Sequence, residues 1–457
     1  MSKPLHIIIL AAGEGTRMKS NCPKMLQSVG GRPMLTHLLD TASALTGEKI
    51  HVVVGSGAEE IRKACSGYPV DWVFQAERHG TGHAVMQAMP GVPDDADVLV
   101  LLGDTPLIPV QLLADMVAEF RGPLSLLTME LEDPTGYGRV LRDPGGNIIG
   151  VIEHKDAEPH QHAIREVNTG IIMASADRLR GWLDRIGCDN ANQEYYLPDI
   201  FSLARTENGE IQGFLAPDAG DLQGANDRRQ LAMLERRYQR RQANALMDLG
   251  VQLADPERIE IRGEVTAGMD VMLDINVVLE GNVRLGDGVN VGPGSVLRDC
   301  DLAPGTSVLA HSVLEGVKTT GACDIGPFAR LRPGTVLSEG CRVGNFVETK
   351  NAVLGTGSKA SHLTYLGDSE IGANVNIGAG TITCNYDGAN KHKTVIGDDV
   401  FVGSDTQLVA PVSVGRGATI GAGSTVTRDA PEGSLTVSRA RQTTIEGWKR
   451  PQKDKDK

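Results

Sequence analysis

The chain has 457 residues, more than one hydrophobic core ordinarily serves, so two or more domains are expected. Its hydrophobic share of 40% and charged share of 23% are typical of a soluble globular protein, and a formal charge of −13 argues against a general nucleic-acid binder. The 55 glycines and the low aromatic share of 4% favour a repeat fold with tight corners and a narrow core.

The N-terminal segment 5–10 (LHIIIL) predicts a fully buried parallel strand. This apolar run is too short for a secretory signal, and no stretch of the sequence is apolar for long enough to span a bilayer. The 7 cysteines are odd in number and show no metal-binding spacing, so free thiols are expected. A cytoplasmic protein without membrane or nucleic-acid partners is the resulting prediction.

A glycine turn follows this strand in the segment 11–18 (AAGEGTRM), with Pro23 and Lys24 after it. Its glycines let backbone N–H groups approach phosphates, and Arg17 and Lys24 supply positive charge. The pattern matches neither G-x-G-x-x-G nor the Walker A motif. A glycine turn alone is as often only a tight turn, but strand, turn, arginine and Pro-Lys together predict a nucleotide site.

More βα units are expected downstream, with strands over 51–54, 70–75 and 98–102 and a helix opening at Ala84. The last of these strands runs into Gly103-Asp104-Thr105-Pro106-Leu107. An acidic residue at the carboxyl edge of a parallel strand lies where open α/β sheets bind ligands, which makes Asp104 a candidate Mg²⁺ ligand together with nucleotide phosphate. The alternative is that Asp104 only caps the next helix.

Several later turns contain residues that suit a sugar-binding pocket. Gly136–Val140 (GYGRV) is a glycine turn into a strand, and the strand 149–153 ends on Glu153, a carboxylate suited to sugar hydroxyls. Asn168-Thr169-Gly170 precedes a strand at 171–173, and 224–227 (GAND) opens a helix. Each of these alone is more typical of a turn than of a site, so their order carries the inference.

A long helix is expected over 228–249, because this stretch lacks Gly and Pro and has apolar residues at helical spacing. Its arginines, interspersed with acids, indicate a solvated helix face rather than a nucleic-acid surface. We interpret it as the connection between two domains, ended by Gly250.

The second half has an apolar residue at every sixth position, a period that fits neither a helix nor an alternating strand. A left-handed parallel β-helix has this period, since each hexad gives a short strand and a turn and three hexads close one coil. We expect the apolar anchors to point inward and the residue after each to be small because the corner is tight. Hexads begin near Val265, slip in phase at intervals, and are clearest at Ile396, Val402, Leu408, Val414, Ile420 and Val426.

The period is lost at 383–395, a polar, turn-rich segment that we expect to leave the stack as a functional loop. Arg332 and Lys350, nearby in the sequence, suit a phosphate. His362 is the natural general base for an attacking amine near neutral pH. A lone histidine in a repeat protein is more often a surface residue, and only its neighbours favour the catalytic interpretation.

The first-half motifs L-A-A-G-x-G-T-R-M…P-K, G-T-G-H-A, L-G-D-x-P-L, G-Y-G-R, E-x-K, N-T-G and N-D, in this order, resemble the sugar-nucleotide pyrophosphorylases. Joined to hexapeptide repeats, they resemble the bacterial family of bifunctional N-acetylglucosamine-1-phosphate uridyltransferase/glucosamine-1-phosphate acetyltransferases over essentially the whole chain. The resemblance implies an α/β Rossmann-like nucleotidyltransferase domain followed by a left-handed parallel β-helix. It also implies acetylation of glucosamine-1-phosphate by acetyl-CoA, then UMP transfer from UTP to give UDP-N-acetylglucosamine for peptidoglycan and lipopolysaccharide synthesis.

In the first half, the resemblance implies that Asp104 and Asn226 bind Mg²⁺ and that Arg17 and Lys24 neutralise the triphosphate. Leu102 departs from the pattern, because some relatives have Tyr at this position. Any contact that the tyrosine ring makes in those relatives is absent from this chain. The uridine and phosphates are expected at Leu10, Ala11, Ala12, Gly13, Lys24, Gln75, Gly80 and Thr81, and the sugar at Gly138, Glu153 and Asn168, with Asn226 beside them.

In the second half, the resemblance implies that His362 deprotonates the amine and that Glu348 orients His362. It also implies a homotrimer with shared acetyl-transfer sites, to which the tail contributes Arg439. The amino-sugar phosphate is expected at Arg332, Lys350, Tyr365, Asn376, Asn385 and Lys391, and acetyl-CoA at Ala379, Asn385, Tyr386, Ser404, Ala422 and Arg439, with Asn385 or Ser404 at the oxyanion.

The expected domains are a uridylyltransferase domain at 1–227, a linker helix at 228–249, the β-helix at 250–437 and a charged tail at 438–457. One alternative is a nucleotidyltransferase whose β-helix serves only assembly or allostery, and another is a regulatory subunit with a degenerate nucleotide site. The first is disfavoured by His362 and Lys350, and the second by the intact glycine turn, Lys24 and Asp104.

Overall fold

The computed structural model describes residues 3–190, 193–207 and 209–453, so the end of the predicted tail lies outside the described residues. The chain divides into two compact units, Met1–Arg240 and Arg241–Lys457. Each unit is described by itself.

The first unit is built on one twisted sheet with the strand order β11-β7-β10-β6-β1-β4-β5. Strand β1 lies parallel to its neighbours β4 and β6, whereas β10 runs antiparallel to β6 and β7, and β8 and β9 form a hairpin beside β10. The bounds are β1 Leu5–Ala11, β4 Ile50–Val54, β5 Asp71–Phe74, β6 Asp97–Leu102, β7 Leu124–Glu130, β8 Arg139–Arg142, β9 Ile148–Ile152, β10 Glu166–Ser175 and β11 Ile211–Leu215, with β2 Ser28–Val29 and β3 Arg32–Pro33 as a separate ribbon.

Strand β1 is almost wholly apolar because both faces of the sheet are covered. Ile8 and Leu10 belong to one core cluster and Ile7 and Ile9 to another, as the alternation of a strand requires. Helices α3, α5 and α6 contribute to the first cluster, and α1, α2 and α4 to the second. The bounds are α1 Met34–Leu45, α2 Ala58–Ala64, α3 Thr81–Ala88, α4 Val110–Glu119, α5 Ala176–Leu183 and α6 Asp199–Thr206.

Helix α3 begins at Thr81, three positions before the expected start at Ala84. Gly80, with φ 102°, makes the turn into the helix. The next glycine lies inside the first turn, because a Cβ at Gly82 would stand 2.9 Å from the carbonyl oxygen of Tyr195. Gly82 is therefore tolerated inside the helix because it allows close packing. Since glycine disfavours helices, the sequence pattern placed the helix start too late.

A single helix, α7, spans Arg228–Asp248. Leu234 packs into a small core of the first unit with Met18 and Val29, while Ala243 and Leu246 belong to the core of the second unit. None of the described helices combines the length and the apolar character that crossing a bilayer requires.

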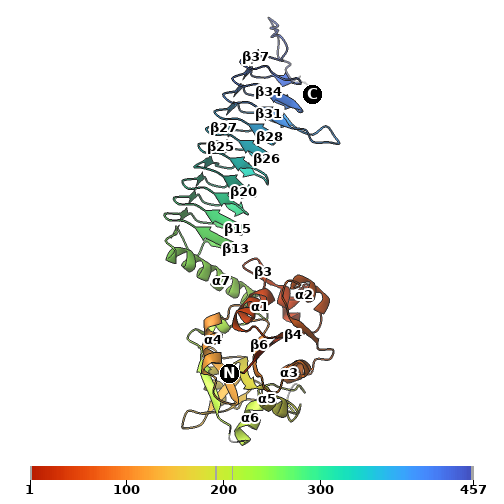
Figure 1. The fold of residues 1–457 in the computed structure, drawn as a ribbon, viewed down its shortest axis with the longest axis vertical. Coiled ribbons are helices and arrows are strands. Elements are labelled where there is room, and N and C mark those ends of the chain that lie inside the picture. The colour runs from red at the N-terminus through yellow and green to blue at the C-terminus, as the bar shows by residue number, and fades with distance from the viewer. Residues whose placement is uncertain (1–2, 191–192, 208, 454–457) are drawn as a thin grey trace. The chain divides into compact units, whose positions relative to one another are not determined.

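The second unit is a left-handed parallel β-helix, in which short strands of successive coils stack in register (Figure 1). Face 1 consists of β12 Gln252–Leu253, β14 Met272–Leu273, β16 Asn290–Val291, β19 Ser307–Val308, β22 Asp324–Ile325, β25 Arg342–Asn345, β27 Lys359–His362, β29 Asn376–Ile377, β32 Phe401–Val402, β35 Thr419–Ile420 and β37 Leu435–Thr436.

The other two faces are joined by the long strands β13 Ile259–Ala267, β15 Val277–Leu285, β26 Glu348–Leu354 and β28 Tyr365–Ile371, which run across the corner between them. Face 2 continues with β17 Val296–Arg298, β20 Val313–Glu315, β23 Arg330–Leu331, β30 Ile382–Cys384, β33 Gln407–Val409 and β36 Thr425–Val426, and face 3 with β18 Asp301–Leu302, β21 Lys318–Thr319, β24 Val336–Leu337, β31 Thr394–Ile396 and β34 Val412–Val414.

The predicted hexad anchors point into the prism, since those from Ile396 to Val426 are at most 2% exposed. The small residue after each anchor is explained by the neighbouring coil and not by a turn conformation. Gly403 has no positive φ, but a Cβ on it would stand 2.5 Å from the backbone nitrogen of Ala422 on the next coil. The glycine is therefore required by close approach between coils, and the left-handed corner position falls two residues later, at Asp405 (φ 56°).

The segment where the hexad period is lost leaves the stack between β30 and β31, and Figure 1 shows it projecting beside β31. An isolated antiparallel bridge joins Tyr386 to Lys391, and Asp387 accepts a hydrogen bond from His392 at 2.7 Å. These contacts give the loop a defined hairpin shape.

Candidate functional site

Two adjoining hollows lie at the carboxyl ends of the parallel strands of the first unit, and Leu10, Thr81 and Leu102 line both. The glycine-turn hollow is lined by Leu10, Ala12, Gly13, Lys24, Met25, Gln75, Arg78, Gly80, Thr81, Ala84, Leu102, Asp104 and Glu194. The sugar-side hollow is lined by Leu10, Thr81, Leu102, Gly136, Tyr137, Gly138, Glu153, Asn168, Thr169, Gly170, Ile172, Leu197, Pro198 and Phe201.

Lys24 joins the two predicted metal ligands. Its side chain is 7% exposed, and its ammonium donates to Asp104 Oδ2 at 2.5 Å and to Asn226 Oδ1 at 2.7 Å. A Cβ at Gly15 would lie 2.6 Å from Lys24 Cβ, and one at Gly224 would lie 3.1 Å from the Asp104 carboxyl carbon. Two glycines thus allow the lysine and the carboxylate to come together.

Asp104 does not cap the next helix. Helix α4 begins at Val110, its N-cap is Pro109, and no side chain caps it. A carboxylate oxygen and an amide oxygen drawn to one cation are the donor set that fits Mg²⁺, which takes one or two protein oxygens and completes its shell with phosphate and water.

The amide of Gln75 is fixed at the floor of the glycine-turn hollow, where it is 3% exposed and its Nε2 lies 3.0 Å from His83 Nδ1. Burial lowers the pKa of His83, so its ring is neutral at pH 7 and accepts this hydrogen bond. Arg78 also lines the hollow and pairs with Glu14 of the glycine turn. The sequence pattern missed Arg78, although a basic residue between Gln75 and the Gly80 turn was a visible signal.

The sugar-side hollow brings Gly138, Glu153 and Asn168 together. A Cβ at Gly138 would lie 3.2 Å from Glu153 Oε1, and the backbone N–H of Asn168 donates to the carbonyl of Gly138 at 2.9 Å. Burial, reinforced by Asp156 and Asp199, raises the pKa of Glu153. The hollow is therefore a small apolar cavity with one carboxyl group and one amide at its wall.

Leu102 forms the wall between the two hollows. A Cβ at Gly170 would lie 2.7 Å from its Cδ1, so the strand β10 approaches it closely. This position therefore contributes an apolar side chain and no hydroxyl.

Two predicted residues of the first unit lie elsewhere. Ala11 is 1% exposed and belongs to the core cluster of Ile7 and Ile9, facing away from the hollows. Arg17 is exposed and lies outside the lining of both hollows. The backbone N–H of Gln230 is the largest cause of the lowered pKa of Asp227, and the charge of Arg17 lowers it further.

In the β-helix, three cations gather at the corner between faces 2 and 3. Arg332 and Lys350 occupy equivalent places on successive coils, as the hydrogen bond from Arg332 N to Thr349 O at 2.9 Å requires. The side-chain contact with Lys391 is the largest cause of the lowered pKa of Lys350, and the charges of Lys391 and Arg332 lower it further. Tyr365 Oη lies close to Gly367, where a Cβ would be only 2.3 Å from it, so the ring lies along the strand toward this corner. The arrangement suits a dianionic phosphate.

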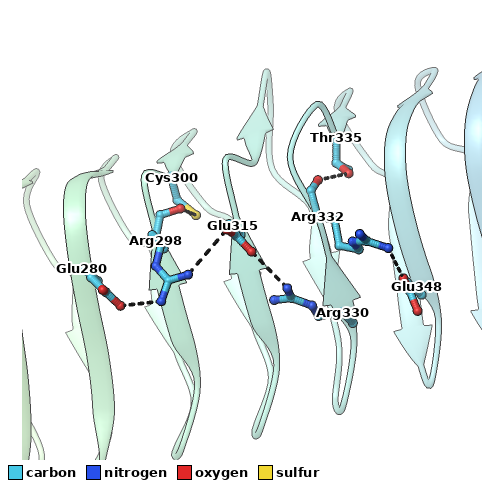
Figure 2. A network of polar contacts seen from close by, with 8 residues as sticks. All are labelled: Glu280, Arg298, Cys300, Glu315, Arg330, Arg332, Thr335 and Glu348. Carbon is cyan, nitrogen blue, oxygen red and sulfur yellow. Dashed lines mark hydrogen bonds and ion pairs between the residues drawn. The ribbon is translucent and has the colours of Figure 1, made fainter.

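Figure 2 shows an ion-pair ladder on face 2 that leads to this corner. Glu280 pairs with Arg298 at 2.8 Å, Arg298 with Glu315 at 3.5 Å, and Glu315 with Arg330 at 3.0 Å. Alternating charges on successive coils neutralise one another, so Arg330 belongs to the ladder and not to the cation cluster.

Within one chain, Glu348 does not orient His362. Glu348 Oε1 accepts a hydrogen bond from Arg332 Nη1 at 2.9 Å (Figure 2). The partner of the histidine is Asn345, whose Oδ1 lies 2.8 Å from His362 Nδ1. Asn345 was missed because its contact joins two coils, and the phase of the hexads slips between them.

A column of corner residues continues from His362 along the stack. The register of β27, β29, β32 and β35 places Ala379, Ser404 and Ala422 above His362 on successive coils. Asp405 N donates to Ala379 O at 2.7 Å and Gly423 N to Ser404 O at 2.8 Å, which fixes the spacing. Arg439 reaches this column, since its Nη1 donates to Ala422 O at 2.6 Å.

The other predicted residues of this half lie away from that column. Asn385 is at the base of the projecting loop, 8% exposed, and donates to Asp368 Oδ2 at 2.5 Å. Tyr386 is 61% exposed on the loop. Asn376 lies on face 1, in register with Lys359. Within one chain the predicted acetyl-transfer residues thus form two groups, one at each edge of face 2, with Asn376 outside both.

Comparison with known proteins gives a consistent result for both units. A model described as "MobA-like NTP transferase domain" matches residues 7–134, and one described as "Bacterial transferase hexapeptide (six repeats)" matches residues 393–428. A "Bifunctional protein GlmU" of Stenotrophomonas maltophilia is 58% identical over 454 residues, covering 99% of this chain and 100% of the relative. Proteins of the same name from Alkalilimnicola ehrlichii and Marinobacter nauticus are 56% and 53% identical over 451 residues each, covering 99% and 98% of this chain and 97% and 99% of the relatives.

Proposed function

The chain belongs to the family of bifunctional GlmU proteins, and we propose that its two transferase domains catalyse consecutive steps on one amino-sugar phosphate. The β-helix transfers the acetyl group of acetyl-CoA to glucosamine-1-phosphate. The first domain then transfers UMP from UTP to N-acetylglucosamine-1-phosphate, giving UDP-N-acetylglucosamine and pyrophosphate for cell-envelope synthesis. Both steps take place in the cytoplasm, where UTP and acetyl-CoA are made.

For uridylyl transfer, the glycine-turn hollow holds the nucleotide and the sugar-side hollow holds the acetylated sugar. A phosphate oxygen of the sugar phosphate attacks the α-phosphorus of UTP, and pyrophosphate leaves with the electrons of the broken P–O bond. Mg²⁺, when bound at Asp104 and Asn226, supplies positive charge to the phosphates. Lys24, beside this site, neutralises the triphosphate, and Glu153 and Asn168 orient the sugar, so the protein acts by alignment and electrostatics.

For acetyl transfer, Arg332, Lys350 and Lys391 hold the phosphate of glucosamine-1-phosphate. The amine nitrogen attacks the thioester carbonyl while His362 takes its proton, and the C–S bond then breaks to release CoA. Acetyl-CoA lies along the column of Ala379, Ser404 and Ala422, which is lined by small side chains and closed by Arg439.

A homotrimer with acetyl-transfer sites shared between chains accounts for the separation of these residues. His362 is five positions before Gly367, the residue in register with Lys350. Between them the chain turns the corner at Leu363 (φ 47°) and crosses face 2, so the histidine and the cations lie at opposite edges of that face. We therefore expect the base of one chain and the phosphate-binding cations of its neighbour to form one site, with Asn376 from an adjoining face.

The observation that supports two activities best is that one chain carries both the Lys24-linked pair Asp104 and Asn226 and the Arg332/Lys350/Lys391 cluster. The test supplies substrates separately and measures two products. Acetyl-CoA with glucosamine-1-phosphate should release free CoA, and UTP with Mg²⁺ and N-acetylglucosamine-1-phosphate should release pyrophosphate. Pyrophosphate without CoA would identify a nucleotidyltransferase with a structural β-helix, and neither product would identify a regulatory subunit.

A further inference from the structure

One side-chain hydrogen bond between successive coils of the β-helix involves the proposed general base, His362. Strand β25 ends at Asn345 and strand β27 ends at His362, and the two residues are in register on successive coils. His362 Nδ1 lies 2.8 Å from Asn345 Oδ1. Asn345 is half-buried and His362 is exposed, so the asparagine meets the inner edge of an imidazole whose outer edge faces solvent.

The backbone on both sides of this contact is fixed. Leu363 N donates to Asn345 O at 3.1 Å, and Thr364 Oγ1 donates to His362 O at 2.7 Å. The residues that follow the pair, Phe346 and Leu363, both adopt the left-handed conformation, with φ 56° and 47°. Two bulky residues held in this costly conformation fix the corner, and with it the direction of the two preceding side chains.

A neutral imidazole carries its proton on one nitrogen and a lone pair on the other. An amide oxygen is only an acceptor, so opposite Asn345 Oδ1 the proton resides on Nδ1 and the lone pair on Nε2. We propose that Asn345 is a positioning residue for acetyl transfer, which holds His362 in the tautomer and orientation whose Nε2 receives the proton of the attacking amine. The inference rests on the proposed acetyl-transfer function.

The choice of an amide over a carboxylate has a chemical consequence. A carboxylate beside the ring would favour the imidazolium and raise the histidine pKa, leaving less free base at neutral pH. Glu348, the nearby carboxylate that the sequence suggested for this task, is bound to Arg332 at 2.9 Å. The two side chains thus have separate tasks, since Glu348 fixes a phosphate-binding cation and Asn345 fixes the base without adding charge.

The experiment compares Asn345→Leu and Asn345→Asp with wild type in the full-length chain, and measures kcat, KM and the pH dependence of CoA release. Asn345→Leu should lower kcat by about tenfold to a hundredfold, less than the ~10²–10⁴-fold that a general base contributes, with both KM values nearly unchanged. Asn345→Asp should restore most of the rate and shift the acidic limb of the kcat/KM profile to higher pH. The matched control, Asn290→Leu at an exposed position of β16 on the same face, should leave all three unchanged.

Pyrophosphate release in the same preparations reports that the chain is folded. The proposal is overturned if Asn345→Leu keeps the wild-type kcat and pH profile, or if only KM changes, which would make Asn345 a binding residue. It is also overturned if Asn345→Asp leaves the acidic limb in place. His362→Ala separates this inference from the proposed function: near-normal acetylation there contradicts the base itself, whereas an inactive His362→Ala beside a normal Asn345→Leu contradicts only the role of Asn345.

Discussion

Replacing Asp104 with Asn removes one negative charge from the Lys24 contact and leaves its shape unchanged. At 2.5 Å and an effective dielectric constant of 20, the two charges attract by about 7 kcal/mol, most of which is offset by desolvation. Removing one partner of a buried pair costs about 3–5 kcal/mol, and we expect the lower end or slightly less because Asn226 still accepts from Lys24.

The expected loss is therefore about 2–3 kcal/mol in the folding free energy of the first unit, which lowers its Tm by about 4–12 °C. Calorimetry of the full chain without Mg²⁺ measures this shift. The same change should lower uridylyl transfer by about 10²–10³-fold, because one electrostatic partner of the transferred phosphate is lost, and acetyl transfer should remain at the wild-type rate.

Asp115→Asn is the matched control, since it removes an equal charge from an exposed position of α4 and should change neither rate. A normal rate of pyrophosphate release in Asp104→Asn would refute the metal-ligand assignment. An equal fall in both activities would show that the effect is unfolding and not chemistry.

Three further outcomes are expected. His362→Ala should abolish CoA release and leave pyrophosphate release intact, and substantial acetylation at neutral pH would contradict the general-base role. Leu408→Ala should cost about 2–5 kcal/mol of stability in chemical denaturation, because Leu408 is 0% exposed inside the prism, and a cost below that range would contradict tight packing there. His6 and His51 are buried with their ring nitrogens 3.0 Å apart, and burial lowers both pKa values below 6.5. The unfolded chain therefore binds protons that the folded chain does not, and stability should fall as pH drops below about 6.5, by up to about 1.4 kcal/mol per pH unit for each histidine. His51→Gln should flatten the dependence of Tm on pH between 7 and 5, and an unchanged slope would exclude the pair as its source.

The architecture followed from the sequence wherever a local steric requirement repeats. Leu408 and the other anchors from Ile396 to Val426 are branched or leucine-sized because such side chains fill the narrow prism. Asp104 comes two residues after the end of a strand with a long apolar run. The side-chain direction of Ala11 could also have been predicted from the sequence. Alternation along β1 places its side chain on the other face of the sheet from those of Leu10 and Ala12.

Side-chain contacts between coils could not be predicted from the sequence pattern. Asn345 and His362 are 17 residues apart, and pairing them requires the length of that particular coil, which the slipping phase of the hexads conceals. The partner of Glu348 could not be predicted either, because only side-chain geometry decides whether this carboxylate pairs with His362 or with Arg332. The reason for Gly403 is similar, since it depends on the backbone of Ala422 one coil away.

The two active sites proposed for this chain act independently, and the most direct measurement of this mixes two defective variants. Asp104→Asn and His362→Ala, each alone with glucosamine-1-phosphate, acetyl-CoA, UTP and Mg²⁺, should form almost no UDP-N-acetylglucosamine. An equal mixture should form it at a substantial rate, because N-acetylglucosamine-1-phosphate released by the first variant is uridylylated by the second. A mixture as inactive as its components, with each variant still folded, would contradict the assignment of one reaction to each domain.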